Sequence, residues 1–392
     1  MRFSSAFKPG VRTLGLLCLL LASCGPGTVP EPEPPEPPRP GELTIVAAGD
    51  NLFHETITAA FREEGGWDFA PIYDLIKPVI SGADLAFINQ ETALGRESFG
   101  YSGYPRFNTP QALAFNLAAA GFDIINQANN HIMDKGEAGV MDTIAAWDRV
   151  RGTAYLGIHR SREERDRRRV IIEKNGLRAG FLAYTYGTNG LAVPGDKPYL
   201  VSLIDEETII RETGALRPLC DVLVVSMHWG DEYGPAPSAG QTALAALLAA
   251  QKVDLVIGHH PHVLQPAEYI LRPDGRQMLC FYSLGNFMSS QRQPAALVGG
   301  LMYVKLTGPA GNIMFADAGI IPVITHYESG WTGYRVYPLY RYTAGLVQKH
   351  RSYHAKTGLN MEYINAVLDS LKVKLIMQNP FAPAGAAPPD PH

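Results

Sequence analysis

The sequence predicts an α/β domain with a largely parallel β-sheet and an additional β-rich segment at its C-terminal end. Three observations support this fold class. Short apolar runs alternate with segments of helical length between Leu43 and Ile257, a dense polar cluster follows each of five apolar runs, and the chain beyond Gln265 consists mainly of strand-like runs. Such alternation is typical of βαβ units, in which helices join parallel strands.

The pattern gives an expected order of elements. The first part predicts strands at 43–48, 84–88 and 122–125, with helices at 69–80, 110–120 and 137–150. Asn175-Gly176 is a hairpin signal between apolar runs at 170–172 and 179–182. Strands at 222–225 and 253–257 then enclose a helix at 241–250. The C-terminal part predicts strands at 279–283, 298–306 and 313–323 and a helix at 360–376.

Composition excludes two classes of protein. Of the 392 residues 46% are hydrophobic, which is too apolar for a disordered chain. The net charge of −4 gives no basic excess, so we expect no nucleic-acid partner. Acidic residues interrupt the arginine-rich stretch 160–169, which predicts a solvated, salt-bridged turn. Cys220 and Cys280 lie in apolar runs and are expected to be buried thiols, although a disulfide stays open.

The N-terminus has the pattern of a secretory signal. Basic residues precede a short leucine-rich run, and residues 1–23 end in Leu-Ala-Ser before Cys24, which resembles a bacterial lipobox. We therefore expect a lipidated Cys24 that anchors an extracytoplasmic protein to a bacterial membrane; an ordinary signal peptide is the alternative. Eight prolines between residues 26 and 40 predict a stiff linker over 24–40, or a proline-rich ligand for a partner. The domain then covers 41–378, and the Pro- and Ala-rich residues 379–392 are an expected disordered tail.

Polar clusters follow five of the predicted strands, where ligand-binding residues of α/β sheets gather. Six of the 11 histidines fall in them. Each residue alone has a structural explanation, such as a turn or cap for Asp50 and a hydrogen-bonded core position for His228. Together the imidazoles and oxygens suit Zn, Mn or Fe rather than Ca²⁺ or Mg²⁺. The clusters are Gly49-Asp50-Asn51-Leu52-Phe53-His54, Asn89-Gln90-Glu91-Thr92, Asn126-Gln127-Ala128-Asn129-Asn130-His131, Ser226-Met227-His228-Trp229-Gly230-Asp231-Glu232 and Gly258-His259-His260-Pro261-His262.

Four stretches carry a family resemblance. Ala128-Asn129-Asn130-His131, Ser226-Met227-His228-Trp229-Gly230, Gly258-His259-His260-Pro261-His262 and Tyr282-Ser283-Leu284-Gly285-Asn286-Phe287 together closely resemble the CapA family. These are poly-γ-glutamate capsule synthesis proteins within the calcineurin-like metallophosphatase superfamily. The resemblance runs from about Leu43 to about Phe287, and it implies a sandwich of two mixed sheets flanked by helices.

The resemblance also implies roles for single residues at a site for one or two divalent ions. Glu91 stands at the position of a bridging carboxylate, and His131 matches the acid that protonates a leaving group. Two features depart from the superfamily pattern. The early Asp-x-His motif is absent, although His54 follows Asp50 by four residues, and Asn89-x-Glu91 replaces a Gly-Asp-x-x-Asp motif. The expected metal ligands are Asp50, Glu91, Asn130, His228, His260 and His262. The expected supporting or substrate contacts are His54, Asn89, His259 and Arg106.

Three functions remain open at this stage. The first is a metal-dependent hydrolase, most simply a phosphoesterase, acting in the synthesis of a capsule or envelope polymer. The second is a non-catalytic assembly factor that holds an anionic polymer or joins a capsule synthase complex. The third is a lipid-anchored module that binds a small solute, which fits six clustered histidines poorly.

Overall fold

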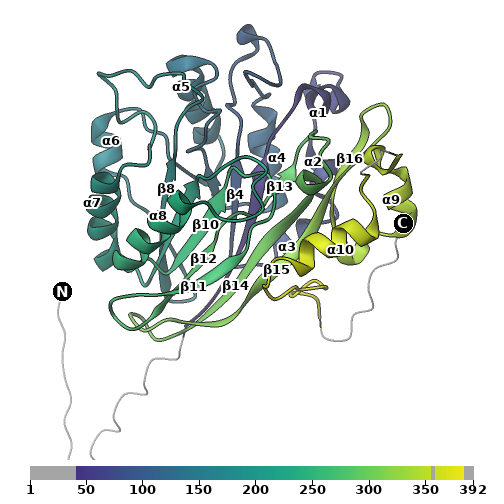
Figure 1. Cartoon of the computed structure of the whole chain (residues 1–392). Coiled ribbons are helices and arrows are strands. Elements are labelled where there is room, and N and C mark those ends of the chain that lie inside the picture. Colours follow the sequence, from purple (N-terminus) through teal and green to yellow (C-terminus); the bar gives the residue numbers. More distant parts are fainter. Residues whose placement is uncertain (1–40, 355–357, 384–392) are drawn as a thin grey trace, which may run out of the picture. The chain divides into compact units, whose positions relative to one another are not determined.

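The computed structural model describes residues 41–354 and 358–383, and two mixed β-sheets organise them (Figure 1). The first sheet has eight strands. β1 lies at its centre, parallel to β4 on one side and antiparallel to β14 on the other, and β13 (Asn286–Met288) pairs with the end of β1. The remaining strands follow the order β16 (Thr332–Pro338), β15 (Met314–Glu328), β14 (Val298–Gly308), β1 (Gly41–Asn51), β4 (Leu85–Gln90), β5 (Ile124–Asn126) and β6 (Ala154–Leu156).

The second sheet has six strands with a parallel centre and two antiparallel edges. A separate two-stranded ribbon joins β2 (Arg62–Glu63) to β3 (Gly66–Trp67). The order in the second sheet is β11 (Ala267–Leu271), β12 (Gln277–Phe281), β10 (Leu255–His259), β9 (Val222–His228), β8 (Leu177–Thr185) and β7 (Val170–Lys174).

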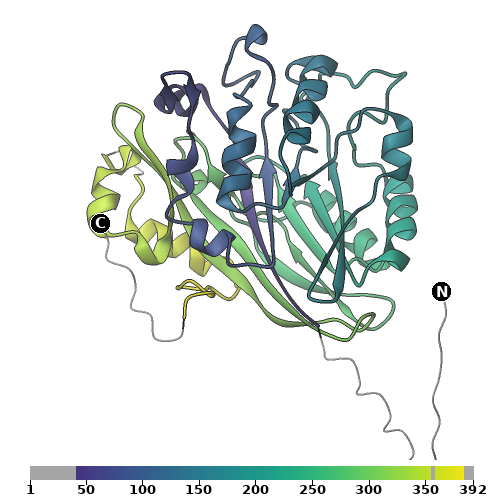
Figure 2. The ribbon, with the colours of Figure 1, turned by 180° about the vertical axis from the view of Figure 1, so that it is seen from behind.

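The helices lie on the outer faces of the sheets (Figures 1 and 2). Two of them, α4 (Ala112–Ala120) and α5 (Gly136–Asp148), cover the first sheet, while α7 (Glu206–Leu216) and α8 (Ala239–Ala250) cover the second. The other α-helices are α1 (Glu55–Ala60), α2 (Ala70–Tyr73), α3 (Lys77–Ile80), α6 (Arg162–Arg167), α9 (Ala344–Lys349) and α10 (Met361–Asp369). Short 3₁₀ turns occupy Glu97–Phe99, Arg217–Leu219, Pro294–Leu297, Leu339–Arg341 and Arg351–His354.

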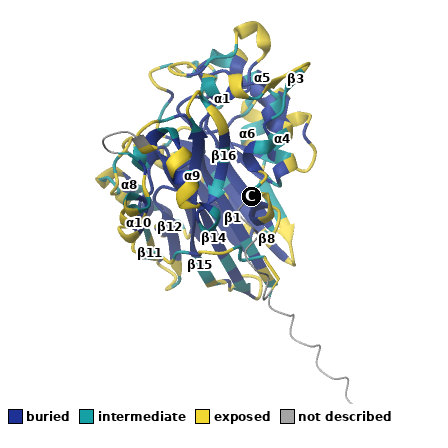
Figure 3. Cartoon of the chain, turned by 90° about the vertical axis from the view of Figure 1, so that its right-hand side faces the viewer, coloured by how far each residue is buried: buried dark blue, intermediate teal, exposed yellow. Residues whose placement is uncertain are grey.

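Strand β9 illustrates how the layers form. Side chains alternate between the two faces of a strand. Val222 and Val224 join the core shared with the first sheet, whereas Leu223 and Val225 pack with Leu248 of α8 in a second cluster. The central strands are therefore apolar on both faces and buried, as Figure 3 shows. The predicted sandwich of two mixed sheets with outer helices is confirmed.

Two predicted helices differ from the structure. The segment 69–80 forms two short helices, because Pro78 has no backbone N–H to continue a helix and stands near the start of α3. The predicted helix 360–376 ends at Asp369, and Ile376 instead donates a backbone hydrogen bond to Ile320 of β15. The stretch 160–169 contains the exposed helix α6, with ion pairs such as Arg167–Glu163 at 2.7 Å.

Several elements were not predicted: α1, β2, β3, β6, β11, β13, β16, α7 and α9. The three-residue strands β6 and β13 are too short for a periodic pattern, and β11 is half exposed at a sheet edge. Helix α7 does carry a signal, since the Asp205 side chain accepts from the backbone N–H of Thr208 as an N-cap.

The cysteines and the chain ends complete the comparison with the sequence. Cys220 and Cys280 are buried and free, as expected. The signal sequence, Cys24 and the proline-rich segment lie outside the described residues, as do 384–392. Phe381, in the expected tail, packs with its ring centroid 5.8 Å from that of Tyr303. None of the helices in the described part of the chain has the length and apolar character needed to cross a bilayer.

Candidate metal centre

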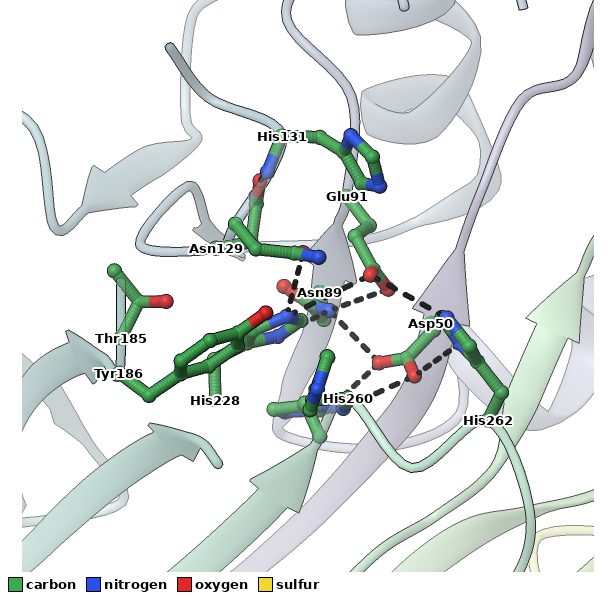
Figure 4. A network of polar contacts seen from close by, with 12 residues as sticks. Asp50, Asn89, Glu91, Asn129, His131, Thr185, Tyr186, His228, His260 and His262 are labelled. Atoms are coloured by element: carbon green, nitrogen blue, oxygen red, sulfur yellow. Dashed lines mark hydrogen bonds and ion pairs between the residues drawn. The ribbon is translucent and has the colours of Figure 1, made fainter. Parts of the chain in front are cut away.

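The five polar clusters converge where the two sheets present the carboxyl ends of their parallel strands (Figure 4). Asp50 is the penultimate residue of β1, and Glu91 directly follows β4 in the first sheet. His228 is the last residue of β9 and His259 the last of β10 in the second sheet. Asn130 follows β5. The predicted cluster residues therefore come from neighbouring strands of both sheets.

Asp50 is the most heavily contacted carboxylate of the centre and is fully buried. Its Oδ2 accepts from the backbone N–H of His260 at 3.1 Å and lies 3.1 Å from His262 Nδ1. Its Oδ1 accepts from Asn89 Nδ2 at 2.8 Å and lies 3.4 Å from His259 Nδ1. These contacts fix both carboxylate oxygens without using an arginine or lysine.

Glu91 lies between two groups of ligand-type atoms. Glu91, His228 and His260 offer one atom each within 4.8 Å of one another, and so do Asp50, Glu91 and His262. Glu91 Oε1 is 3.5 Å from His228 Nε2 and 3.8 Å from His262 Nε2, and it has no hydrogen-bond partner. The shared glutamate makes this a pair of adjoining three-residue groups.

Asn130 completes the first group. Its Oδ1 lies 2.9 Å from His228 Nε2, so an amide oxygen and an imidazole nitrogen face each other. Its Nδ2 donates to Asn189 Oδ1 at 3.2 Å, which fixes the amide orientation. Asn89 plays a similar bracing part, because its Oδ1 accepts from Asn126 Nδ2 at 2.8 Å while its Nδ2 faces Asp50.

Backbone strain directs two of the histidines into the centre. His260 has φ 96° and His262 has φ 61°, both in the left-handed region. Residues other than glycine adopt it rarely, at a cost of order 1–3 kcal/mol each. The left-handed backbone at these two positions lets the turn after β10 bring both imidazoles next to Asp50 and Glu91 (Figure 4).

The electrostatics of the centre favour a bound cation. Burial strongly raises the pKa of Glu91, and the charge of Asp50 raises it further. Burial opposes ionisation of Asp50, but contacts with His259 and His262 bring its pKa well below the usual value. Burial lowers the pKa of His228 well below normal and that of His260 to about 3. His228 and His260 are therefore neutral imidazoles beside carboxylates that contact no arginine or lysine among the described residues.

These observations test whether the residues suit a metal ion. Buried polar atoms nearly always find a partner, yet Glu91 Oε1 and His260 Nδ1 have none. Neutral imidazoles, carboxylates and an amide oxygen form the mixed donor set of Zn, Mn or Fe. The residues therefore fit a divalent transition metal, and the two groups provide two adjacent positions.

His131 lies beside the centre rather than in either group. Its Nδ1 is 2.8 Å from Asp134 Oδ2, and its ring packs edge-on against Phe107 at 4.6 Å. Asp134 Oδ2 also accepts from the backbone N–H of Phe107 at 2.7 Å. The imidazole is thus held through Nδ1, which leaves Nε2 as its free nitrogen.

Sequence reasoning missed three residues of this neighbourhood: Asp134, Asn189 and Tyr186. Asp134 stands three residues after His131, a spacing that could have suggested the pair. The Tyr186 ring lies 4.6 Å from that of His260, and its hydroxyl donates to Asn189 Oδ1 at 3.2 Å. Both residues follow β8, whose sequence carries no polar cluster, so no pattern pointed to them.

Three expected supporting residues have different surroundings. The His259 ring stacks on Phe87 at 5.9 Å, and its Nδ1 lies 3.4 Å from Asp50 Oδ1. His54 belongs to neither metal-binding group: its Nδ1 accepts from the backbone N–H of Ser290 at 3.2 Å, and burial lowers its pKa to about 4. Arg106 is exposed and lines an open pocket together with His131.

The motif Tyr282–Phe287 braces the centre through its backbone. The backbone N–H of Asp50 donates to the Gly285 carbonyl at 2.9 Å where β13 joins β1. A Cβ at Gly49 would come within 1.9 Å of that carbonyl oxygen, so only glycine allows this approach. The motif therefore fixes the strand end that carries Asp50.

Comparison with known proteins gives a family match. The family described as "Bacterial capsule synthesis protein PGA_cap" matches residues 44–291. A capsule biosynthesis protein CapA of Bacillus anthracis is 34% identical over 177 residues, covering 44% of this chain and 41% of the relative. A PGA biosynthesis protein CapA of Bacillus subtilis is 32% identical over 256 residues, which is 64% of each chain. The chain thus spans less than two thirds of the length of either relative.

More distant matches include an accessory protein and two solved structures. A probable polyglutamine synthesis accessory protein of Mycobacterium tuberculosis is 26% identical over 263 residues, covering 60% of this chain and 64% of the relative. The NAD nucleotidase of Haemophilus influenzae is 12% identical, with a TM-score of 0.46 over 86% of this chain and 57% of that chain. A calcineurin-like phosphoesterase of Bacillus subtilis is 17% identical, with a TM-score of 0.46 over 83% and 99%.

Proposed function

Since the chain belongs to the bacterial capsule synthesis protein family PGA_cap, we propose that it acts in capsule or cell-envelope polymer synthesis as a metal-dependent hydrolase of the phosphoesterase type. The observation that carries the proposal is the position of Glu91 between two groups of ligand-type atoms. Asp50 and His262 would complete one metal position, and His228, His260 and Asn130 the other. Relatives named for PGA biosynthesis make poly-γ-glutamate the polymer to test first.

The chemistry follows from the arrangement around the centre. Divalent ions there supply Lewis-acid polarisation of a phosphoryl group and lower the pKa of water. As the oxygen of water bonds to phosphorus and the bond to the leaving oxygen breaks, His131 Nε2 gives its proton to that oxygen. Asp134 holds the imidazole through Nδ1 at 2.8 Å, so Nε2 faces the substrate. The neutral His228 and His260 add no charge that would repel a cation.

Metal content is the direct test. The purified protein should contain one to two equivalents of a transition metal, measured by elemental analysis, and His260→Ala should lose much of it. His159→Ala is the matched control, because His159 is a partly buried histidine away from the centre that faces Ser202 Oγ at 3.2 Å. Equal metal in both variants, or none in the unaltered protein, overturns the metal centre.

Turnover separates catalysis from assembly. The name of the Mycobacterium relative, an accessory protein, supports a second candidate: a factor that binds an anionic polymer or a synthase complex without turnover. Metal-loaded protein should hydrolyse a member of a phosphomonoester and phosphodiester panel, and His131→Ala should abolish this with metal retained. Metal binding and polymer binding with no turnover on any ester would favour the assembly factor.

The proposal includes an extracytoplasmic, lipid-anchored location. It rests on the lipobox-like residues before Cys24 and on the proline-rich stretch that follows. In a bacterial host, the full chain should incorporate labelled fatty acid and fractionate with membranes, and Cys24→Ala should do neither. Label in the Cys24→Ala chain would contradict acylation of this residue.

A further inference from the structure

An open pocket of about 380 Å³ lies beside His131 and carries opposite charges. His131 and Asp134 line it near the metal centre, while Arg106 and Glu232 bring a guanidinium and a carboxylate to the same space. His131, the proposed proton donor, is thus one of the lining residues. On the proposed function, on which this inference rests, a group bound here would belong to the leaving group.

The two charges are free to meet a ligand. Among the residues that the structure describes, neither Arg106 nor Glu232 has an oppositely charged group within 4.0 Å, and they do not pair with each other. Asp134, the other acid of the pocket, is already engaged by His131 and by the backbone N–H of Phe107. Because an unpaired guanidinium and an unpaired carboxylate line the same pocket, a ligand that carries both a negative and a positive charge could bind to both.

Three of the remaining lining residues contribute apolar surface. Tyr104, 78% exposed, and Pro105 form one part of the wall, and Leu191 forms another. Asn189 adds a polar group at the inner end, where it contacts Asn130 and Tyr186. A short aliphatic stem would fit such a surface, whereas a simple inorganic anion would leave both the apolar wall and Glu232 unused.

Glu232 also lies close enough to affect the centre. Burial is the main cause that raises the pKa of Tyr186 to about 12, and the negative charge of Glu232 is the second cause. The charge of Glu232 also contributes to the raised pKa of Glu91. Arg106 also lines a second pocket, which contains Lys135.

We propose that this pocket binds an amino-acid-like group, with its carboxylate at Arg106, its ammonium at Glu232 and its aliphatic stem against Tyr104, Pro105 and Leu191. The proposal names the part of the substrate next to the bond that is broken and adds no chemical step. Because Arg106 and Glu232 are exposed, the charge contacts are weak, and we expect dissociation constants in the millimolar range.

A set of matched probes tests each charge separately. Leucine carries both charges and an aliphatic stem, leucinamide lacks the carboxylate, and 4-methylpentanoate lacks the ammonium group. Binding to metal-loaded full-length protein is followed by titration calorimetry or protein NMR. Leucine should bind about fivefold more tightly than either analogue, a difference that corresponds to one exposed charge contact.

Two variants then identify which residue binds the carboxylate of the ligand and which binds its ammonium group. Arg106→Gln should remove the preference for leucine over leucinamide, and Glu232→Gln should remove the preference over 4-methylpentanoate. Arg162→Gln and Glu173→Gln, at exposed positions outside this pocket, should change neither preference.

The outcomes separate this proposal from the proposed function. Equal affinity for the three probes, no binding of leucine, or tighter binding of 4-methylpentanoate would overturn the amino-acid site. The titration requires no turnover, so leucine binding by a protein that hydrolyses no ester upholds the site and contradicts only the hydrolase. Ester hydrolysis by a protein that does not bind leucine would support the hydrolase and overturn the amino-acid site.

Discussion

His131 Nδ1 lies 2.8 Å from Asp134 Oδ2, and both side chains are almost completely buried at the edge of the metal centre. In this contact Nδ1 of the imidazole is bound to Asp134, and Nε2 stays available for a reacting group. A carboxylate in this position selects the imidazole tautomer and holds the ring in one orientation. Asp134 is itself fixed by the backbone N–H of Phe107.

The first prediction concerns this pair. Asp134→Asn should lower kcat by about 100-fold, because an amide can hold the imidazole in the wrong tautomer. Metal content should stay unchanged, since Asp134 belongs to neither metal-binding group. Steady-state kinetics on an ester that the unaltered protein hydrolyses, with elemental analysis in parallel, gives both values. A kcat within twofold of the unaltered protein would exclude an orienting role for Asp134.

The second prediction concerns Glu91. Glu91→Gln should remove the stabilisation that added Zn²⁺ or Mn²⁺ gives, because both metal-binding groups use this carboxylate. The metal-free variant should melt at the same temperature as the unaltered protein or higher, since burial already disfavours ionised Glu91. Thermal unfolding with and without EDTA measures both effects. Glu137→Gln, at an exposed ion pair with Lys197, is the control and should keep the full response to metal.

The third prediction is a loss of stability in mild acid. Burial lowers the pKa of His159 to about 3 and that of His326 and His350 to about 4, whereas the ordinary pKa of a histidine side chain is 6.5. Between these values the unfolded chain binds protons that the folded chain does not, so stability falls as pH falls from about 6.5 to about 4. Each histidine contributes up to about 1.4 kcal/mol per pH unit.

Urea unfolding of metal-free protein from pH 7.5 to 4.5 measures this loss. The raised pKa of Glu91 acts in the opposite direction, because the folded chain takes up that proton first, so Glu91→Gln should steepen the decline. A midpoint that stays constant across the range would contradict the neutral burial of these histidines. His350→Gln should make the loss of stability with falling pH less steep, because it removes one of the three histidines.

The fourth prediction concerns the close approach of two strands. Gly49→Ala would place a Cβ 1.9 Å from the Gly285 carbonyl oxygen, and the backbones must separate. We expect a loss of at least about 1–3 kcal/mol in unfolding free energy together with weaker metal binding, since Asp50 is the next residue. Gly187→Ala is the matched control, because no atom lies within 4 Å of its added Cβ. Comparable destabilisation in both variants would show that crowding at Gly49 is not the cause.

The sequence predicted the convergence of ligands better than it predicted their arrangement. The strand ends at Asp50, Glu91, His228 and His260 could be located because apolar runs and dense polar clusters are local patterns. Parallel strands bring such ends together wherever the sheet is assembled. The sharing of Glu91 between two groups depends on side-chain conformations, and sequence spacing alone does not determine them.

The residues that the sequence did not reveal act through tertiary contacts. Asn189 reaches Asn130 from a loop far along the chain. His54, close to Asp50 in sequence, instead contacts the Ser290 backbone. The sequence pattern predicts one helix over 69–80, whereas the missing backbone donor of Pro78 interrupts it in the fold.

The position of β1 has a consequence for how the protein is made. β1 is the first described strand, yet it pairs from Gly41 opposite Gly308 along nearly its whole length with β14. A ribosome must therefore synthesise most of the domain before the strand that carries Asp50 acquires both of its neighbours. Contacts between segments so distant in the chain slow folding. Nascent chains that end before β14 should stay open and unable to retain metal, so the centre matures only near the end of translation.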